Sequence, residues 1–191
     1  MYINLMLEEN RNKYIYNWLL LITFLVILMI IVGGLTRLTD SGLSITKWDL
    51  FSGILPPLTL SQWMESFELY KKIPEYKLIN SQMTLEEFKF IYWWEYLHRL
   101  LGRIIGLLYF FPLLYFSYKK FINKKYLKSL YLIFLLILIQ GFVGWYMVKS
   151  GLSERTDVSQ YRLSLHLTLA FIIYILLVWN LLLNRLINSK K

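Results

Sequence analysis

Both histidines of this 191-residue chain lie in apolar segments that are long enough to cross a membrane. His98 belongs to the stretch WWEYLHR (Trp93–Arg99), and His166 belongs to LSLHL (Leu163–Leu167). An imidazole in hydrocarbon is costly, so ionisable residues inside membrane segments are functional-site candidates by default. Two imidazoles on different helices are suited to axial coordination of a haem iron. The alternative for each is a hydrogen-bonded histidine with a structural role only.

Charged side chains accompany the first histidine. Glu95 lies three residues before His98 and shares its helix face, and Arg99 lies four residues after Glu95, where an ion pair can form. Arg103 follows one turn later, and Arg37 lies where the first apolar segment ends. Arginine matches carboxylate geometry with two parallel hydrogen bonds, so we expect Arg37, Arg99 and Arg103 to contribute to cofactor binding. The alternatives are a structural Glu95–Arg99 pair and an interfacial Arg37.

Four apolar segments reach, or nearly reach, the roughly 20 residues that a membrane-spanning helix needs. They cover about residues 18–34, 90–118, 127–148 and 163–183. A helix satisfies every backbone group within the segment, whereas strands of a membrane barrel would be shorter and would alternate in polarity. The sequence therefore predicts an all-α integral membrane protein, a single membrane domain over residues 1–191, built as a four-helix transmembrane bundle with a long loop over residues 35–89.

Composition supports a membrane protein and excludes several kinds of site. The chain is 57% hydrophobic and 18% aromatic, and its net charge of +9 resides largely in basic residues near the ends of the apolar segments. This charge is typical of membrane orientation signals, so we expect membrane lipid and no nucleic acid as partner. Without cysteine, disulfides and cysteine-held metal clusters are excluded. The long first apolar run argues against a cleaved signal peptide, and Glu8 and Glu9 argue against a transit peptide.

The lysines between the second and third segments predict the orientation. They occur without an acidic neighbour, so this loop and both termini should face the cytoplasm, or the matrix in an organelle: Lys119, Lys120, Lys124, Lys125 and Lys128. His98 then lies eight residues, or roughly 12 Å, into its helix, and His166 five residues, or roughly 8 Å. Both histidines are thus expected at similar depth near the outer face, as two ligands of one haem require.

The long outer loop carries signals of ordered structure. Thr59 or Ser61 can cap a short helix, and Thr84 with Glu87 fits a capping box at the start of the second membrane helix. Trp48, with Trp63 and Phe67, is a candidate for packing the loop onto the membrane surface. Gly102 and Gly106 form a G-x-x-x-G pattern, which we interpret as a helix-packing face, the alternative being space for a macrocycle.

A series of motifs runs through nearly the whole chain. It comprises Gly33–Thr39, Ser41–Ser44, Trp48, Gly53, Pro56, Pro57, Trp63, Phe67, Tyr70, Pro74–Tyr76, Asn80, Met83, Glu95–Arg103, Gln140–Leu152 and Arg162–His166. This series resembles the haem A synthase family, in its long-loop form without cysteine.

The resemblance implies an integral membrane oxidoreductase that converts haem O to haem A for cytochrome c oxidase, by oxidising one porphyrin methyl group to a formyl group. Members of the family resemble two tandem four-helix bundles, each with a histidine pair near the outer face. One bundle holds the substrate haem and the other a haem b cofactor. By motif match, Glu95 is the catalytic glutamate of the first bundle, and His98 and His166 are its haem ligands. The expected location is the bacterial inner membrane, or the mitochondrial inner membrane as an alternative.

This chain resembles the first bundle only, so the resemblance implies one half of the family's two-bundle protein. A separately encoded second half or self-association into a homo-oligomer would complete it, and haem O synthase or cytochrome oxidase assembly factors are further possible partners. The alternatives are an inactive truncated half, a bis-histidine haem b protein for electron transfer, and a scaffold without haem.

Overall fold

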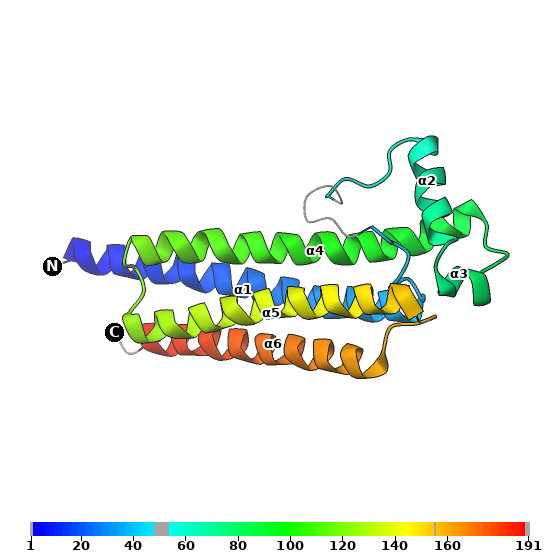
Figure 1. Cartoon of the computed structure of the whole chain (residues 1–191). Helices are drawn as coiled ribbons and strands as arrows, with labels where there is room; N and C mark the ends of the chain where they lie inside the picture. Colours follow the sequence, from blue (N-terminus) through cyan, green and yellow to red (C-terminus); the bar gives the residue numbers. More distant parts are fainter. Residues whose placement is uncertain (1, 48–53, 155, 190–191) are drawn as a thin grey trace. The chain divides into compact units, whose positions relative to one another are not determined.

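The computed structural model describes residues 2–47, 54–154 and 156–189, and within these ranges all regular structure is helical. Four helices are long and two are short (Figure 1). In chain order they are α1 (Tyr2–Leu38), α2 (Leu60–Tyr70), α3 (Pro74–Leu78), α4 (Leu85–Tyr118), α5 (Lys124–Glu154) and α6 (Gln160–Ser189).

The four long helices each contain a stretch that is long and apolar enough to span a membrane: Arg11–Leu38, Leu85–Tyr118, Tyr126–Leu152 and Gln160–Arg185. This confirms the predicted all-α membrane protein with four spans. Each helix extends beyond its predicted apolar segment, because helical hydrogen bonding continues into flanking polar residues that hydropathy does not detect. Large apolar side chains remain exposed along these helices, as expected for surfaces that face lipid.

The contacts group the chain into two compact units, and each long helix contributes to both. Unit 1 comprises Met1–Leu28, Arg103–Gln140 and Thr168–Lys191, and unit 2 comprises Met29–Gly102 and Gly141–Leu167. That the two units form a single membrane domain, as the sequence predicts, stays a prediction. The candidate site residues other than Arg103 belong to unit 2.

Within unit 1, a proline inside α4 is accommodated by a donor from α1. Pro112 has no N–H, so it cannot bond to the carbonyl of Leu108 four residues earlier. The indole Nε1–H of Trp18 donates to this carbonyl at 2.8 Å. Trp18 is buried, and its ring packs against those of Tyr109 and Phe116. The bond therefore satisfies the freed carbonyl and joins two helices.

Buried hydrogen bonds also join the other helices of unit 1. The Tyr109 hydroxyl on α4 donates to the carbonyl of Leu130 on α5 at 2.8 Å. The Tyr126 hydroxyl on α5 donates to the carbonyl of Asn180 on α6 at 2.8 Å, and the Asn180 amide donates to Ser129 Oγ at 2.9 Å. Such bonds matter because helices in lipid gain no hydrophobic driving force from packing on one another.

In unit 2, the segment between α1 and α4 packs through aromatic side chains. Trp63 of α2 contacts Tyr92 of α4 with ring centroids 4.9 Å apart, and Phe67 stacks on Phe88 at 5.0 Å. Both rings of α2 are buried, as predicted for an ordered segment rather than a linker. Trp48, which we expected to join them, lies outside the described residues.

Both predicted caps of this segment are present. Thr59, rather than Ser61, is the N-cap of α2: its hydroxyl accepts from the Gln62 N–H, while the Gln62 side chain accepts from the Thr59 N–H. Before α4, the Thr84 N–H donates to Glu87 Oε2 at 2.8 Å, and the Glu87 N–H donates to Thr84 Oγ1 at 3.3 Å. These capping boxes satisfy backbone donors that a helix start leaves without intrahelical partners.

Candidate functional site

The two histidines each pack against a glycine of a neighbouring helix in unit 2. A Cβ at Gly33 of α1 would lie 3.3 Å from Nε2 of His98 on α4, and a Cβ at Gly144 of α5 would lie 3.0 Å from Cε1 of His166 on α6. Any larger residue at these positions would crowd the imidazoles. His98 and His166 are also near enough for their charges to interact. Unit 2 thus brings the two predicted ligands together.

Glu95 is held in a pocket of donors. It is 2% exposed, and its Oε1 accepts from Arg99 Nη2 at 2.5 Å. Its Oε2 accepts from the Ser44 hydroxyl and from the Ile45 N–H, each at 2.7 Å. A carboxylate offers about four acceptor positions, and the described residues fill three of them and leave one. The predicted pairing of Glu95 with Arg99 is confirmed, and the carboxyl is fixed in place.

The arginines have different surroundings. Arg99 donates to the Ile45 carbonyl at 3.1 Å as well as to Glu95, so its guanidinium is largely engaged by the protein. Arg37 is less constrained: it forms a 3.6 Å ion pair with the exposed Asp40 at the end of α1. Arg103 belongs to unit 1, and its position relative to the histidines stays a prediction.

Ser44 and Ile45 were not recognised as site residues from the sequence. They contact Glu95 across 51 and 50 residues of chain, and no local spacing connects them. The available signal was that Ser44 belongs to Ser41–Ser44, one of the short motifs that carry the family resemblance, without any indication of a partner. The segment after α1 is therefore part of the site, since it supplies two of the three donors to the carboxylate.

Glu75 is a second residue that was not recognised as a site residue from the sequence, although it belongs to the motif Pro74–Tyr76. It is 4% exposed in the short helix α3, and its Oε2 accepts no hydrogen bond from the described residues. A glutamate after a proline in the first turn of a helix is common, so its sequence context gave no reason to expect burial. Burial, together with nearby carboxylates, raises its pKa to about 8.

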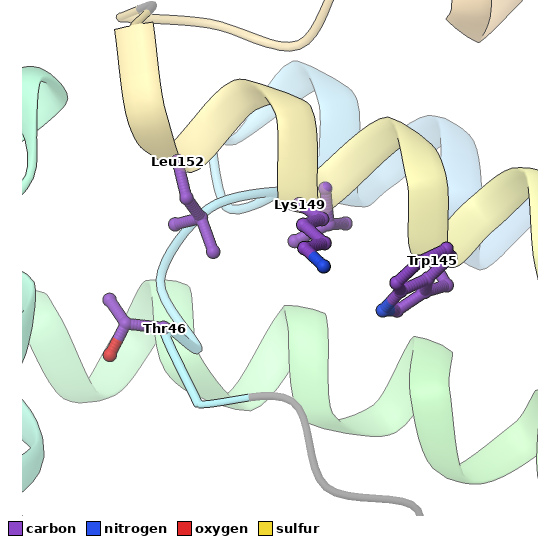
Figure 2. A pocket seen from close by; sticks show the side chains of 5 residues that line it. Thr46, Trp145, Lys149 and Leu152 are labelled. Carbon is purple, nitrogen blue, oxygen red and sulfur yellow. The ribbon is translucent and has the colours of Figure 1, made fainter.

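A separate pocket of about 250 Å³ lies at the end of α5 (Figure 2). Thr46, Trp145, Val148, Lys149 and Leu152 line it, and the Lys149 ammonium lies 4.9 Å from the centroid of the Trp145 ring. Neither histidine nor Glu95 belongs to this lining. The combination of an aromatic ring and a lysine is typical of a membrane interface.

Comparison with known proteins gives a consistent result. The haem A synthase of Pelagibacter ubique (strain HTCC1062) is 54% identical over 177 residues, which are 92% of this chain and 52% of that protein. The haem A synthase of Rhodopseudomonas palustris (strain BisB5) is 52% identical, over 92% of this chain and 48% of that protein. The haem A synthase of Parvibaculum lavamentivorans is 48% identical, over 99% of this chain and 55% of that protein. No solved structure matches the chain significantly.

The chain spans about half the length of the curated relatives that it matches. The family described as COX15-CtaA, cytochrome oxidase assembly protein, matches residues 16–190, which is nearly the whole chain. The membrane helices and the extent of these matches together establish that this multi-pass membrane protein belongs to the COX15-CtaA family, whose haem A synthases use haem.

Proposed function

We propose that this chain is the substrate-binding half of a haem A synthase, and that it positions haem O for oxidation of one methyl group to a formyl group. The observation that carries this proposal is the buried Glu95, fixed by three donors in the same unit as two neighbouring imidazoles. Relatives named haem A synthase, about 50% identical over this half, support the same activity.

The surroundings of the histidines fit a haem. His98 and His166, which come from different helices, would hold the haem iron through their imidazole nitrogens. Gly33 keeps α1 free of a side chain beside His98 Nε2, and Gly144 does the same on α5 beside His166. Arg37, half-exposed and paired with Asp40 at 3.6 Å, is the arginine best placed to take a propionate.

Glu95 would act through its fixed negative charge and its one remaining acceptor position. A carboxylate held in a dry site stabilises positive charge that develops on a neighbouring group during oxidation. Its free acceptor position can also orient a water, or take a proton from it. When bound, haem supplies the redox chemistry, whereas the protein supplies position and electrostatics. Arg99, Ser44 and the Ile45 N–H keep the carboxylate from rotating away.

In our proposal, a second four-helix bundle of the kind that the family resemblance implies completes the enzyme. The haem b cofactor of the family would then reside in that half. We place the protein in a bacterial inner membrane with both termini in the cytoplasm, on the basis of the bacterial relatives and of the lysines between α4 and α5. Haem O synthase and cytochrome oxidase assembly factors are candidate neighbours there.

The test is haem extraction and chromatography from membranes that contain this chain and a source of haem O, with and without the second half of a relative. The wild type is expected to bind haem O and to yield haem A when the second half is present. Glu95→Gln keeps the shape of the side chain but removes its charge, so haem should be retained and haem A lost. Glu86→Gln is the matched control, because Glu86 lies on the same helix with its side chain 79% exposed.

Three other outcomes would contradict the proposal. Undiminished haem A formation by Glu95→Gln would refute the role of the carboxylate. A tightly bound haem b that cycles between oxidation states, with no haem A even when the second half is supplied, would indicate an electron-transfer protein. Haem binding that survives His98→Ala and His166→Ala would show that these imidazoles are not the ligands.

A further inference from the structure

Glu75 is a buried carboxyl without a cationic partner in the described part of the chain. It is 4% exposed, although α3 lies outside the four membrane-spanning stretches and water is available nearby. Its Oε2 accepts no hydrogen bond from any described residue. A buried carboxylate without compensation is costly, so a carboxyl in such a place is normally protonated or has a function that requires it.

Two polar side chains, those of Asn80 and Tyr70, lie in series next to this carboxyl. Tyr70, which is fully buried, accepts a hydrogen bond from the Asn80 amide at 2.8 Å, so its own hydroxyl hydrogen is free to point elsewhere. The phenol lies close enough to Glu75 for a hydrogen-bond interaction with the carboxyl. Burial and the neighbouring carboxyl raise the pKa of Tyr70, so the phenol stays a donor. The Asn80 amide thus orients the Tyr70 phenol beside Glu75.

The charged groups with the largest effects on Glu75 are acidic. Glu95 of α4 has the strongest effect, followed by Asp40 after α1 and Asp157 between α5 and α6. The arginines next to two of these acids are already engaged, Arg99 by Glu95 and Arg37 by Asp40. The pKa of Glu75 of about 8 follows from burial first and from these acids second, so both protonation states are accessible near neutral pH.

These acids differ in their access to water. Glu95 is almost completely buried, and Glu75 is nearly as buried. Asp157 is partly exposed, and the Asp40 side chain is 79% exposed. Glu75 is therefore a second buried carboxyl within the electrostatic influence of Glu95, and the two aspartates that also act on it have access to solvent.

We propose that Glu75 is a proton-relay residue, which accepts protons released beside Glu95 and passes them to the aqueous face near Asp40 and Asp157. This inference rests on the proposed function. Conversion of a methyl group to a formyl group with one water releases four protons and four electrons, and the electrons pass to an electron-accepting haem. Each relayed proton forms an O–H bond at Glu75 Oε2 and leaves by transfer to solvent, so the residue is regenerated unchanged.

The experiment compares the pH dependence of haem A formation in the wild type, Glu75→Gln and Glu68→Gln, each with the second half present. Glutamine keeps the shape of the side chain but cannot carry the proton, so we expect a rate loss of about 100-fold, the lower end of what acid–base groups contribute. The wild-type profile should bend near pH 8, and this inflection should vanish in Glu75→Gln. Glu68→Gln is the matched control, because Glu68 is an exposed glutamate of α2 paired with Lys71.

Infrared titration of the full chain in membranes provides a readout that does not depend on activity. The infrared band of a protonated carboxyl should disappear around pH 8 in the wild type and should be absent in Glu75→Gln. In Glu95→Gln the band should disappear at a lower pH, because a neighbouring negative charge is gone. Glu75→Asp keeps a titrating carboxyl, so its rate profile should keep an inflection.

Different results would refute the relay and the proposed function on which it rests. A Glu75→Gln enzyme with the wild-type rate and pH profile refutes the relay alone, as does the absence of a carboxyl that titrates near pH 8. Loss of bound haem in both Glu75→Gln and Glu75→Asp would show that Glu75 has a structural role in haem binding and is not a relay. A wild type that binds haem but never forms haem A refutes the proposed function, and the relay with it.

Discussion

Replacing Gly144 by alanine should weaken haem binding through His166. The new Cβ would lie 3.0 Å from His166 Cε1, whereas carbon atoms in favourable contact are about 3.5–4.0 Å apart. The imidazole, or α5 itself, must therefore move by roughly 0.5 Å, and such overpacking typically costs about 1–3 kcal/mol. If this cost falls on the haem-bound state, affinity decreases roughly 5- to 150-fold.

The assay is an equilibrium haem titration, followed by the Soret band, on purified Gly144→Ala and Gly141→Ala proteins. Gly141 lies one turn earlier on α5, and a Cβ there would meet nothing within 4 Å. Alanine is also the better helix former, by about 0.5–1 kcal/mol, so Gly141→Ala should be as stable as the wild type or more so. Equal haem affinity of the two variants would refute the reasoning. Gly33→Ala and Gly34→Ala form a second pair beside His98, with a smaller expected effect because the contact is 3.3 Å.

Three further outcomes are expected. Burial raises the pKa of Glu75 from 4.5 to about 8, so its contribution to the free energy of unfolding is complete below pH 4.5 and is lost as the pH rises to about 8. The loss amounts to up to about 5 kcal/mol. Hydrogen exchange of the segment around α3 should therefore accelerate over this pH range in the wild type but not in Glu75→Gln. Thr59→Ala should cost about 1 kcal/mol in local stability, detected as faster exchange in α2, whereas an unchanged rate would exclude a role for the cap. Asn180→Ala removes the bond to Ser129 and should destabilise the protein by about 1 kcal/mol in a detergent unfolding titration, and wild-type stability would contradict the importance of this bond.

Features encoded within a few residues of one another could be predicted from the sequence. The four membrane helices follow from apolar segments of sufficient length, and the caps at Thr59 and Thr84 follow from a hydroxyl three residues before a glutamine or a glutamate. The pairing of Glu95 with Arg99 follows from their spacing of one helical turn. In each case the physical cause lies within one segment.

Features that depend on distant segments could not be predicted in this way. Ser44 reaches Glu95 only after the chain has folded back from the end of α1 onto α4. The contact of Gly144 with His166 likewise requires α5 and α6 to pack in one register, whereas the sequence showed only a glycine and a histidine 22 residues apart. The raised pKa of Glu75 likewise depends on its burial in the folded chain and on acids from distant segments, such as Glu95 and Asp40, so nothing near it in the sequence indicates the shift.

The bond between Trp18 and the carbonyl freed by Pro112 has a consequence for biogenesis. In lipid, an unsatisfied carbonyl costs several kcal/mol, so α4 inserted alone would carry a defect at Leu108. Because α1 is synthesised first, the indole that repairs this defect is already in the membrane when α4 leaves the ribosome. The order of the helices along the chain thus supplies the donor before the acceptor. Separated from α1, α4 would lack this donor, and the inserted helix would be less stable in the bilayer.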